Sequence, residues 1–210
     1  MKSRFCDMKR ILTFLALGLC ALACAPQAEN GPGAMSFDEV VATRRSVRSY
    51  DASKPVGEAE VRAIIAATQE APSWANTQTS RYYVALGSEK RAALLEMVGG
   101  NKERVKNAPV LVVSTFVNGK SGFFGGQATN EIGDGWGAYD NGLSNAYFIL
   151  KAREMGFDTL IMGMRDSEAI RAEFRIPDDE TVMAVIALGC RADEPTRPER
   201  IPAQDVVKFF

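Results

Sequence analysis

The hydrophobic pattern of the chain divides residues 36–210 into helical and extended segments. In several stretches apolar side chains recur every three or four positions, which is typical of helices that bury one face. The helices predicted in this way are a short one that begins at Ser36, then 58–70, 88–98, 139–155 and 167–174, with a further short helix at 102–106. Stretches rich in β-branched and aromatic residues predict strands at 81–86, 109–116, 159–162 and 181–188. This pattern predicts an α+β domain in which helices wrap a small buried sheet.

Two of the predicted strands and two of the connecting segments have an unusual composition. Residues 109–116 and 181–188 are almost entirely apolar, so both strands are expected to be buried on two faces. Residues 71–78 contain proline, serine and asparagine but no glycine, which favours an ordered loop. Residues 118–137 contain seven glycines together with Phe123, Phe124 and Trp136. A segment of this length is either a lid or binding loop, or a mobile surface insertion.

The first 34 residues form a leader that we separate from the folded domain at 35–210. Lys9 and Arg10 precede an apolar run at 11–23, which is followed by Cys24 and a polar spacer. This order is typical of an export signal, and the run is shorter than the roughly 20 residues that a membrane-spanning helix needs. The position of Cys24 resembles that of the lipidated cysteine in bacterial lipoproteins. We therefore expect an exported, membrane-anchored lipoprotein, periplasmic or on the cell surface, with plain secretion and an uncleaved anchor as the alternatives.

Composition narrows the chemistry that the domain can perform. The chain has 25 Lys and Arg against 26 Asp and Glu, a balance that argues against general nucleic-acid binding. It contains no histidine, which excludes a Ser-His-Asp triad, a Cys-His pair and His-ligated zinc. Of the four cysteines, only Cys190 lies outside the leader, so the domain is expected to hold no intrachain disulfide and no metal site. A cofactor or carboxylates must therefore carry any chemistry.

An arginine-rich cluster, TRRSVRSY at 43–50, is the strongest local signal for a ligand. It contains Arg44, Arg45, Ser46, Arg48 and Ser49. Guanidinium groups this close repel one another unless an anion lies among them, and their planar donors match phosphate geometry. The cluster predicts either a phosphate site or a solvated basic turn. The chain has no GxGxxG and no GxxxxGK[ST] motif, so a Rossmann or P-loop nucleotide site is not expected.

Four segments, in this order along the chain, resemble the nitroreductase family of FMN-dependent oxidoreductases. RRSVRSY at 44–50 is similar to the family's opening RRSxR, and PSWANTQ at 72–78 is similar to its PSxxNxQP. The helix 140–156 has the Asp, Gly and Ala spacing of the family's long central helix. The fourth segment is IPDDETVMAVIALG at 176–189, which precedes a basic tail. Together these segments extend the resemblance over residues 36–210.

The resemblance implies a nitroreductase-like α+β fold with a small central mixed β-sheet, and a homodimer with FMN at its interface. It also implies the residues that bind FMN. Arg44, Ser46 and Arg48 would hold the phosphate, and Arg45 would lie along the ribityl chain or ring edge. Arg197 and Arg200 in the tail would complete the phosphate site, although the family usually spaces its basic pair more closely. Arg200 is the stronger candidate of the two.

The same resemblance implies that two other segments contact the flavin ring. Asn76 would hydrogen-bond the flavin beside Ser73 and Gln78, and backbone N–H groups of Met162 and Gly163 would lie near flavin N5. The chain departs from the family where Thr79 replaces the usual proline and where Cys190 replaces a frequent aromatic residue.

The reaction implied is a ping-pong transfer of hydride from NAD(P)H to flavin N5, and then of electrons to a small electron-poor acceptor such as a nitroaromatic or a quinone. The flavin carries this chemistry, so no catalytic side chain is assigned. The alternatives are a flavin-dependent dehydrogenase or reductive dehalogenase with a specific substrate, and a non-catalytic flavin-binding surface lipoprotein.

Several polar residues have simpler interpretations. We expect Asp140 to cap its helix, Cys190 to lie in the core, and Trp74 to serve in packing. The acidic residues of 166–180 are expected to form a solvated face.

Overall fold

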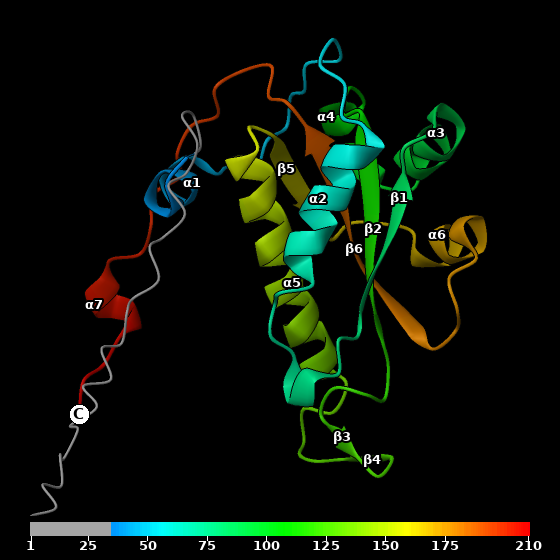
Figure 1. Cartoon of the computed structure of the whole chain (residues 1–210), viewed down its shortest axis with the longest axis vertical. Coiled ribbons are helices and arrows are strands. Elements are labelled where there is room, and N and C mark those ends of the chain that lie inside the picture. Colours follow the sequence, from blue (N-terminus) through cyan, green and yellow to red (C-terminus); the bar gives the residue numbers. More distant parts are fainter. Residues whose placement is uncertain (1–34) are drawn as a thin grey trace, which may run out of the picture. The chain divides into compact units, whose positions relative to one another are not determined.

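A four-stranded sheet lies at the centre of the fold (Figure 1). The computed structural model describes residues 35–210, which belong to one compact unit, Pro32–Phe210. The predicted leader, with Cys24, lies outside the described residues. The strand order is β1-β2-β6-β5, and the strands are β1 Ser80–Ala85, β2 Val110–Val117, β6 Glu180–Gly189 and β5 Asp158–Met162.

All three strand pairs of this sheet are antiparallel. The predicted α+β class is confirmed. The sheet had been expected to be mixed, but among residues 35–210 the isolated bridge between Ser46 and Thr159 is the only parallel pairing. The physical reason is that β1 and β2, and likewise β5 and β6, follow each other in the chain and pair directly as neighbours.

Strand β2 is buried on both faces, as predicted, and so is β6 from Ala184 onward, whereas Met183 of β6 is 38% exposed. Val110 and Val112 join one apolar cluster, whereas Leu111 and Val113 join the other, because successive side chains of a strand point to opposite faces. On the first face, α2 Glu58–Thr68 and the 20-residue α5 Gly135–Glu154 cover the sheet. The second face is covered by α3 Ser88–Glu96, α4 Lys102–Val105 and α6 Ser167–Phe174. The sheet therefore lies between two layers of helices (Figure 1).

The remaining elements are short. They are α1 Phe37–Thr43, the 3-10 turns η1 Trp74–Asn76 and η2 Gly99–Asn101, the hairpin strands β3 Phe123–Phe124 and β4 Gln127–Ala128, and α7 Ala203–Val206. The start of α1 is as predicted: the Glu39 N–H donates to Ser36 Oγ over 3.3 Å, and the Ser36 N–H donates to the Glu39 carboxylate over 2.7 Å. Among the described residues, no helix is both long enough and apolar enough to cross a membrane.

Helix α5 begins at Gly135, four residues before its predicted start at Tyr139. The glycines of this region were interpreted as loop residues, yet Gly137 lies within the first turns of the helix. A Cβ on Gly137 would come within 2.4 Å of the Phe116 ring, so close packing against β2 requires a glycine there. The prediction that Asp140 caps α5 is wrong, because Asp134 occupies the N-cap position and Asp140 is buried within the helix.

Glu180 corrects the expectation that all acidic residues of 166–180 are solvated. Its side chain is only 6% exposed and accepts hydrogen bonds from Thr115 Oγ1 and from the Tyr83 hydroxyl, the latter over 3.0 Å. Burial, and then this contact with Glu180, raises the pKa of Tyr83 to about 12. Cys190 is half-buried rather than in the core, and burial raises the pKa of its thiol.

Candidate functional site

The arginine-rich segment after α1 is held in place by apolar and backbone contacts, so its basic side chains are not needed to anchor it. The Val47 side chain is 1% exposed, and its N–H donates to the Thr159 carbonyl of β5 over 3.0 Å. The Tyr50 ring is also buried, and its hydroxyl donates to the Val47 carbonyl over 3.2 Å. The parallel bridge from Ser46 to Thr159 adds a further link to β5. Residues 44–48 are therefore held along the edge of the sheet.

The C-terminal tail lies against the same segment. The Ala192 N–H donates to the Ser49 carbonyl over 3.0 Å, and the Asp51 N–H donates to the Cys190 carbonyl over 2.9 Å. This pairing brings the two ends of the domain together around a cavity of about 430 Å³. The lining residues are Arg44, Arg45, Ser46, Arg48, Pro195, Thr196, Pro198 and Arg200.

The cavity is cationic, and no acidic side chain of the described residues neutralises it. Among the ion pairs of residues 35–210, none involves Arg44, Arg45, Arg48 or Arg200. Burial lowers the pKa of the Arg45 guanidinium, and the charges of its arginine neighbours lower it further. The Arg45 and Arg48 side chains donate to carbonyls of their own segment, over 2.7 and 3.0 Å. The donors and the uncompensated charge fit a phosphate group.

Arg197 has a different place from the other predicted phosphate ligands. Its side chain is exposed and is not part of the cavity lining, although its charge is the largest electrostatic contribution that lowers the pKa of Arg45. The structure thus brings Arg200 to the predicted phosphate site and leaves Arg197 beside it.

A buried ion cluster beneath the arginines was not predicted. Asp158, whose side chain is 2% exposed, accepts from Arg191 Nε over 2.8 Å and lies 3.4 Å from Arg153 Nη1. Arg191 Nη2 also donates to the Thr43 carbonyl over 3.2 Å, and Arg153 Nε donates to Thr43 Oγ1 over 3.0 Å. The contact with Asp158 raises the pKa of Arg191. One signal was present in the sequence: Asp158 opens an otherwise apolar strand, and a carboxylate buried there requires cationic partners.

The predicted flavin contacts of Met162 and Gly163 lie at the far end of the same strand. Met162 is three residues beyond Thr159, which corresponds to about 10 Å along an extended strand. Its side chain is buried, whereas Gly163 is exposed. Arg165 fixes this end, since its Nη1 donates to the Gly163 carbonyl over 2.6 Å and its Nε donates to the Val182 carbonyl over 3.2 Å.

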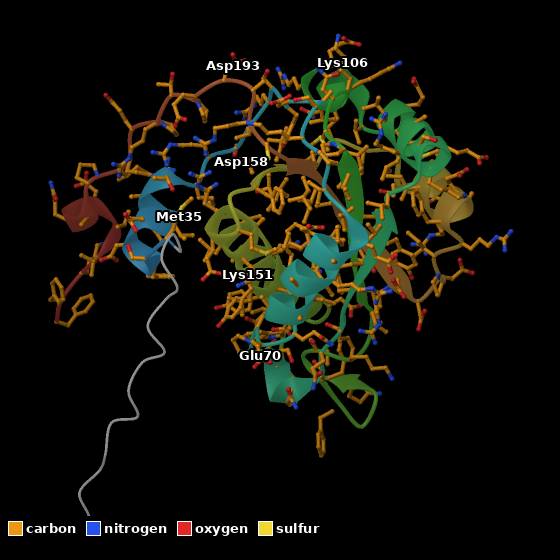
Figure 2. The ribbon with its side chains drawn as sticks, turned by 45° about the horizontal axis from the view of Figure 1, so that its top comes forward. Met35, Glu70, Lys106, Lys151, Asp158 and Asp193 are labelled. Atoms are coloured by element: carbon orange, nitrogen blue, oxygen red, sulfur yellow. The ribbon has the colours of Figure 1, made fainter. Side chains whose placement is uncertain are left out.

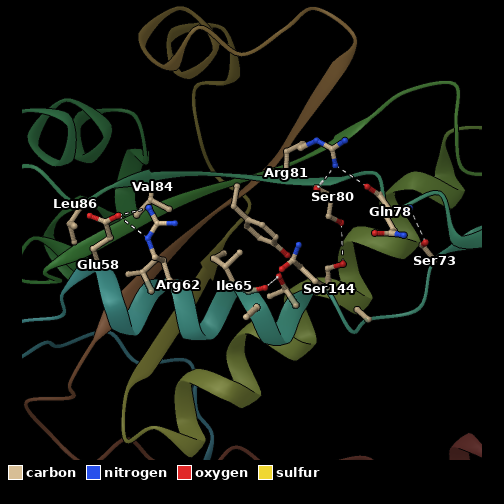
Figure 3. A pocket seen from close by; sticks show the side chains of 16 residues that line it. Glu58, Arg62, Ile65, Ser73, Gln78, Ser80, Arg81, Val84, Leu86 and Ser144 are labelled. Atoms are coloured by element: carbon tan, nitrogen blue, oxygen red, sulfur yellow. Dashed lines mark hydrogen bonds and ion pairs between the residues drawn. The ribbon is translucent and has the colours of Figure 1, made fainter.

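The third predicted segment, Ser73, Asn76 and Gln78, forms a closed loop. Ser73 Oγ accepts the Gln78 N–H over 2.9 Å, and Gln78 Nε2 donates to Asn76 Oδ1 over 3.2 Å. Figure 3 shows Ser73 and Gln78 at one end of a cavity of about 740 Å³ between α2 and β1. Trp74 is half-buried in this loop, and its backbone N–H is bound by Asp140 of α5.

This loop does not lie beside the arginine cluster within one chain. Thr43 contacts Arg153 near the C-terminal end of α5, whereas Trp74 contacts Asp140 near its N-terminal end. The two α5 contacts are thirteen positions apart, which corresponds to about 20 Å of helix. In Figure 2, Asp158 lies near the tail at Asp193, and Glu70, which precedes the loop, lies at the opposite end of the molecule. The structure therefore assembles the site in two separate parts.

The comparisons with known proteins agree with this architecture. The model of the "Nitroreductase family" matches residues 41–190. A NADH dehydrogenase of Thermus thermophilus is 28% identical over 188 residues, which cover 78% of this chain and 91% of the relative. A protein from Exiguobacterium sibiricum, solved in complex with FMN, superposes with a TM-score of 0.76 at 21% identity, over 84% of this chain and 98% of that one. The NADPH:FMN oxidoreductase of Vibrio harveyi, solved with NAD+, superposes with a TM-score of 0.68 at 23% identity, over 82% of this chain and 76% of that one.

The structural likeness, at these identities, establishes the shared fold. The family model spans more than half of the 210 residues and includes the arginine-rich segment, the 73–78 loop and all four strands of the sheet. The chain belongs to the nitroreductase family.

Proposed function

We propose that the chain is an FMN-dependent oxidoreductase that takes electrons from NAD(P)H and passes them to an electron-poor small molecule, a nitroaromatic or a quinone. The observation that carries the proposal is the cationic cavity between residues 44–48 and the tail, which no carboxylate of the described chain neutralises. Relatives named as a NADH dehydrogenase and as a NADPH:FMN oxidoreductase support the choice of donor and cofactor.

The cavity residues would bind the FMN phosphate, which carries nearly two negative charges at neutral pH. Arg44, Arg45, Arg48 and Arg200 supply the positive charge, and the Ser46 hydroxyl supplies a further donor. Bonds between guanidinium and phosphate are about twice as strong as neutral hydrogen bonds. The Asp158 cluster below the cavity would keep Arg191 and Arg153 in place and hold the segment at Thr43.

The far end of β5 would contact the flavin ring through main-chain groups. Arg165 Nη1 donates to the Gly163 carbonyl, which orients the Gly163–Met164 peptide directly after the N–H groups of Met162 and Gly163. FMN bound in this way would supply the hydride acceptor and donor, which agrees with a chain that has no histidine. The residues of the chain bind and orient; none is required as an acid or a nucleophile.

A second copy of the chain would complete the site. Ser73, Asn76 and Gln78 are separated from the arginine cluster by most of the length of α5, so the loop of one copy would meet the arginines of its partner. The separation of the two parts along α5 supports a homodimer, and exposed apolar side chains such as Phe37 of α1 (71% exposed) and Val206 of α7 (69% exposed) would be available for contact with the second copy.

Steady-state kinetics test the proposal. NAD(P)H oxidation should be slow alone and accelerate when a nitroaromatic or a quinone is added, and double-reciprocal plots at several acceptor concentrations should give parallel lines, as a ping-pong reaction requires. FMN-loaded protein that is inert to both nicotinamides would instead support a specific flavin-dependent dehydrogenase, a dehalogenase or a non-catalytic flavoprotein.

A further inference from the structure

The loop at 73–78 has a backbone conformation that L-residues rarely adopt. Ala75, Asn76 and Gln78 have φ values of 46°, 57° and 49°, and none of them is a glycine. The left-handed region is sterically unfavourable for residues with a Cβ, least so for asparagine, so Ala75 and Gln78 in this region indicate a strained loop. Strain of this kind persists only where the surrounding structure holds the backbone in place.

A buried carboxylate holds the start of this loop. Asp140 is 3% exposed, and its Oδ2 accepts the N–H of Trp74 over 3.0 Å. Trp74 directly precedes Ala75, the first of the strained residues. The loop is closed at its other end by Ser73 Oγ, which accepts the Gln78 N–H. Asp140 thus fixes the loop to α5 at the position where the unfavourable backbone begins.

The part of α5 that carries Asp140 is itself fixed to the sheet. The next residue, Asn141, is fully buried, and its Nδ2 donates to the Thr115 carbonyl of β2 over 2.9 Å. Ser114 Oγ donates to Asn141 Oδ1 over 3.0 Å and to Asn145 Oδ1 over 2.9 Å. These buried contacts fix α5 against β2. Asp140 is therefore held in place on α5, and its bond to Trp74 fixes the loop relative to the sheet.

We propose that Asp140 is a positioning residue, which keeps the 73–78 loop in a strained conformation that is ready to bind the flavin. The inference rests on the proposed function, in which Ser73, Asn76 and Gln78 contact FMN. A loop that is ordered before binding loses less conformational entropy when the ligand arrives, so its affinity is higher. Asp140 acts through the backbone and needs no contact with the cofactor.

Asp134 provides a matched control. It stands at the N-cap position of α5, and its Oδ1 accepts the N–H of Gly119 over 2.6 Å. Removal of either carboxylate breaks one bond to a backbone N–H, but only Asp140 holds the 73–78 loop. We therefore compare Asp140→Ala, Asp140→Asn and Asp134→Ala in the full-length chain.

Two measurements are made on each variant: the Kd for FMN by flavin fluorescence, and hydrogen exchange of the Trp74 and Gln78 amides without FMN. Asp140→Ala should raise the Kd at least tenfold and accelerate both exchanges. Asp140→Asn keeps an acceptor oxygen, so its Kd should stay within threefold of wild type, as should that of Asp134→Ala. If Asp140→Ala does not fold, Asp140→Leu removes the acceptor and retains side-chain volume.

A rescue variant separates positioning from a general loss of stability. Ala75→Gly makes the left-handed backbone accessible without a clamp, so it should recover part of the FMN affinity in the Asp140→Ala background and change the Kd little by itself. Unchanged Kd and exchange in Asp140→Ala would overturn the inference, and so would a weakened Kd that Ala75→Gly does not improve. Wild-type protein that binds no FMN would refute the proposed function instead, and the exchange measurement would still test the role of Asp140.

Discussion

Replacement of Arg44 by alanine tests the phosphate site most simply. Arg44 lines the cavity between residues 44–48 and the tail, and no acidic residue of the described chain pairs with it. Its backbone N–H donates to the Val40 carbonyl at the end of α1, and alanine keeps that bond. The substitution should therefore remove a ligand contact and leave the free energy of unfolding nearly unchanged.

The magnitude follows from the charges around Arg44. Removal of one partner from a desolvated charge pair costs about 2–5 kcal/mol, which corresponds to roughly 30- to 5,000-fold in Kd. Here the other arginines still line the cavity, and the loss of Arg44 also relieves its repulsion with Arg45. Both effects offset part of the loss. We predict a Kd for FMN that is raised about 30- to 100-fold, at the lower end of that range.

Fluorescence titration of apo-protein with FMN measures this change, with Arg104→Ala as the control. Arg104 lies exposed on α4, and its Nη1 donates to Asn101 Oδ1 over 3.1 Å, so its replacement removes the same charge away from the residues assigned to FMN. The Kd of the control variant for FMN should stay within threefold of the wild-type value. In wild type the Kd should also rise with ionic strength, and more steeply than in Arg44→Ala. A Kd for Arg44→Ala equal to that of the control would remove Arg44 from the site.

Three further predictions concern the support of the site, the alkaline limit of stability and the leader. Asp158→Asn removes the anion that Arg153 and Arg191 share, while Arg191 keeps its ion pair with Glu194, and should lower the free energy of unfolding by about 3 kcal/mol in urea denaturation, the lower end for a broken buried pair; a loss below 1 kcal/mol would contradict the cluster. The pKa of Tyr83 is raised to about 12 from an unfolded value near 10, so its contribution to stability is complete below pH 10 and is lost as the pH rises towards 12. Tyr83→Phe should therefore make the fall in the free energy of unfolding between pH 10 and pH 12 shallower than in wild type. An equal fall in both proteins would be inconsistent with the raised pKa. Cys24→Ser should abolish incorporation of labelled palmitate and release the protein from the membrane fraction of bacteria. An unlabelled wild type would contradict lipidation, and would argue for plain secretion if it is soluble and for an uncleaved anchor if it stays in the membrane fraction.

Local sequence signals predicted the elements whose causes are local. The capping box of Ser36 and Glu39 marked the start of α1, and the apolar run 109–116 marked a strand buried on two faces. Both effects depend on residues close together in sequence. The start of α5 could not be found in this way, because Gly137 is required by Phe116, a contact across the fold that sequence spacing does not show.

The same distinction between local signals and contacts across the fold applies to the site. The arginine cluster was visible because its charges are adjacent, and the family resemblance supplied Arg200 from the far end of the chain. The pairing of Asp158 with Arg191 joins residues 33 positions apart and depends on the antiparallel pairing of β5 with β6, which sets Asp158 opposite Gly189. The left-handed backbone of Ala75 and Gln78 had no local signal, whereas Asn76 is of a residue type that tolerates this region. Tertiary contacts, rather than local preference, impose that conformation.

The central claim is that this chain binds FMN at its arginine cavity and reduces it with NAD(P)H. An anaerobic absorbance spectrum of the FMN-loaded protein after gel filtration tests it directly. The account predicts a yellow protein whose flavin absorbance is bleached by NADH or NADPH and restored by a nitroaromatic or a quinone. A colourless protein that fails to retain added FMN would contradict it.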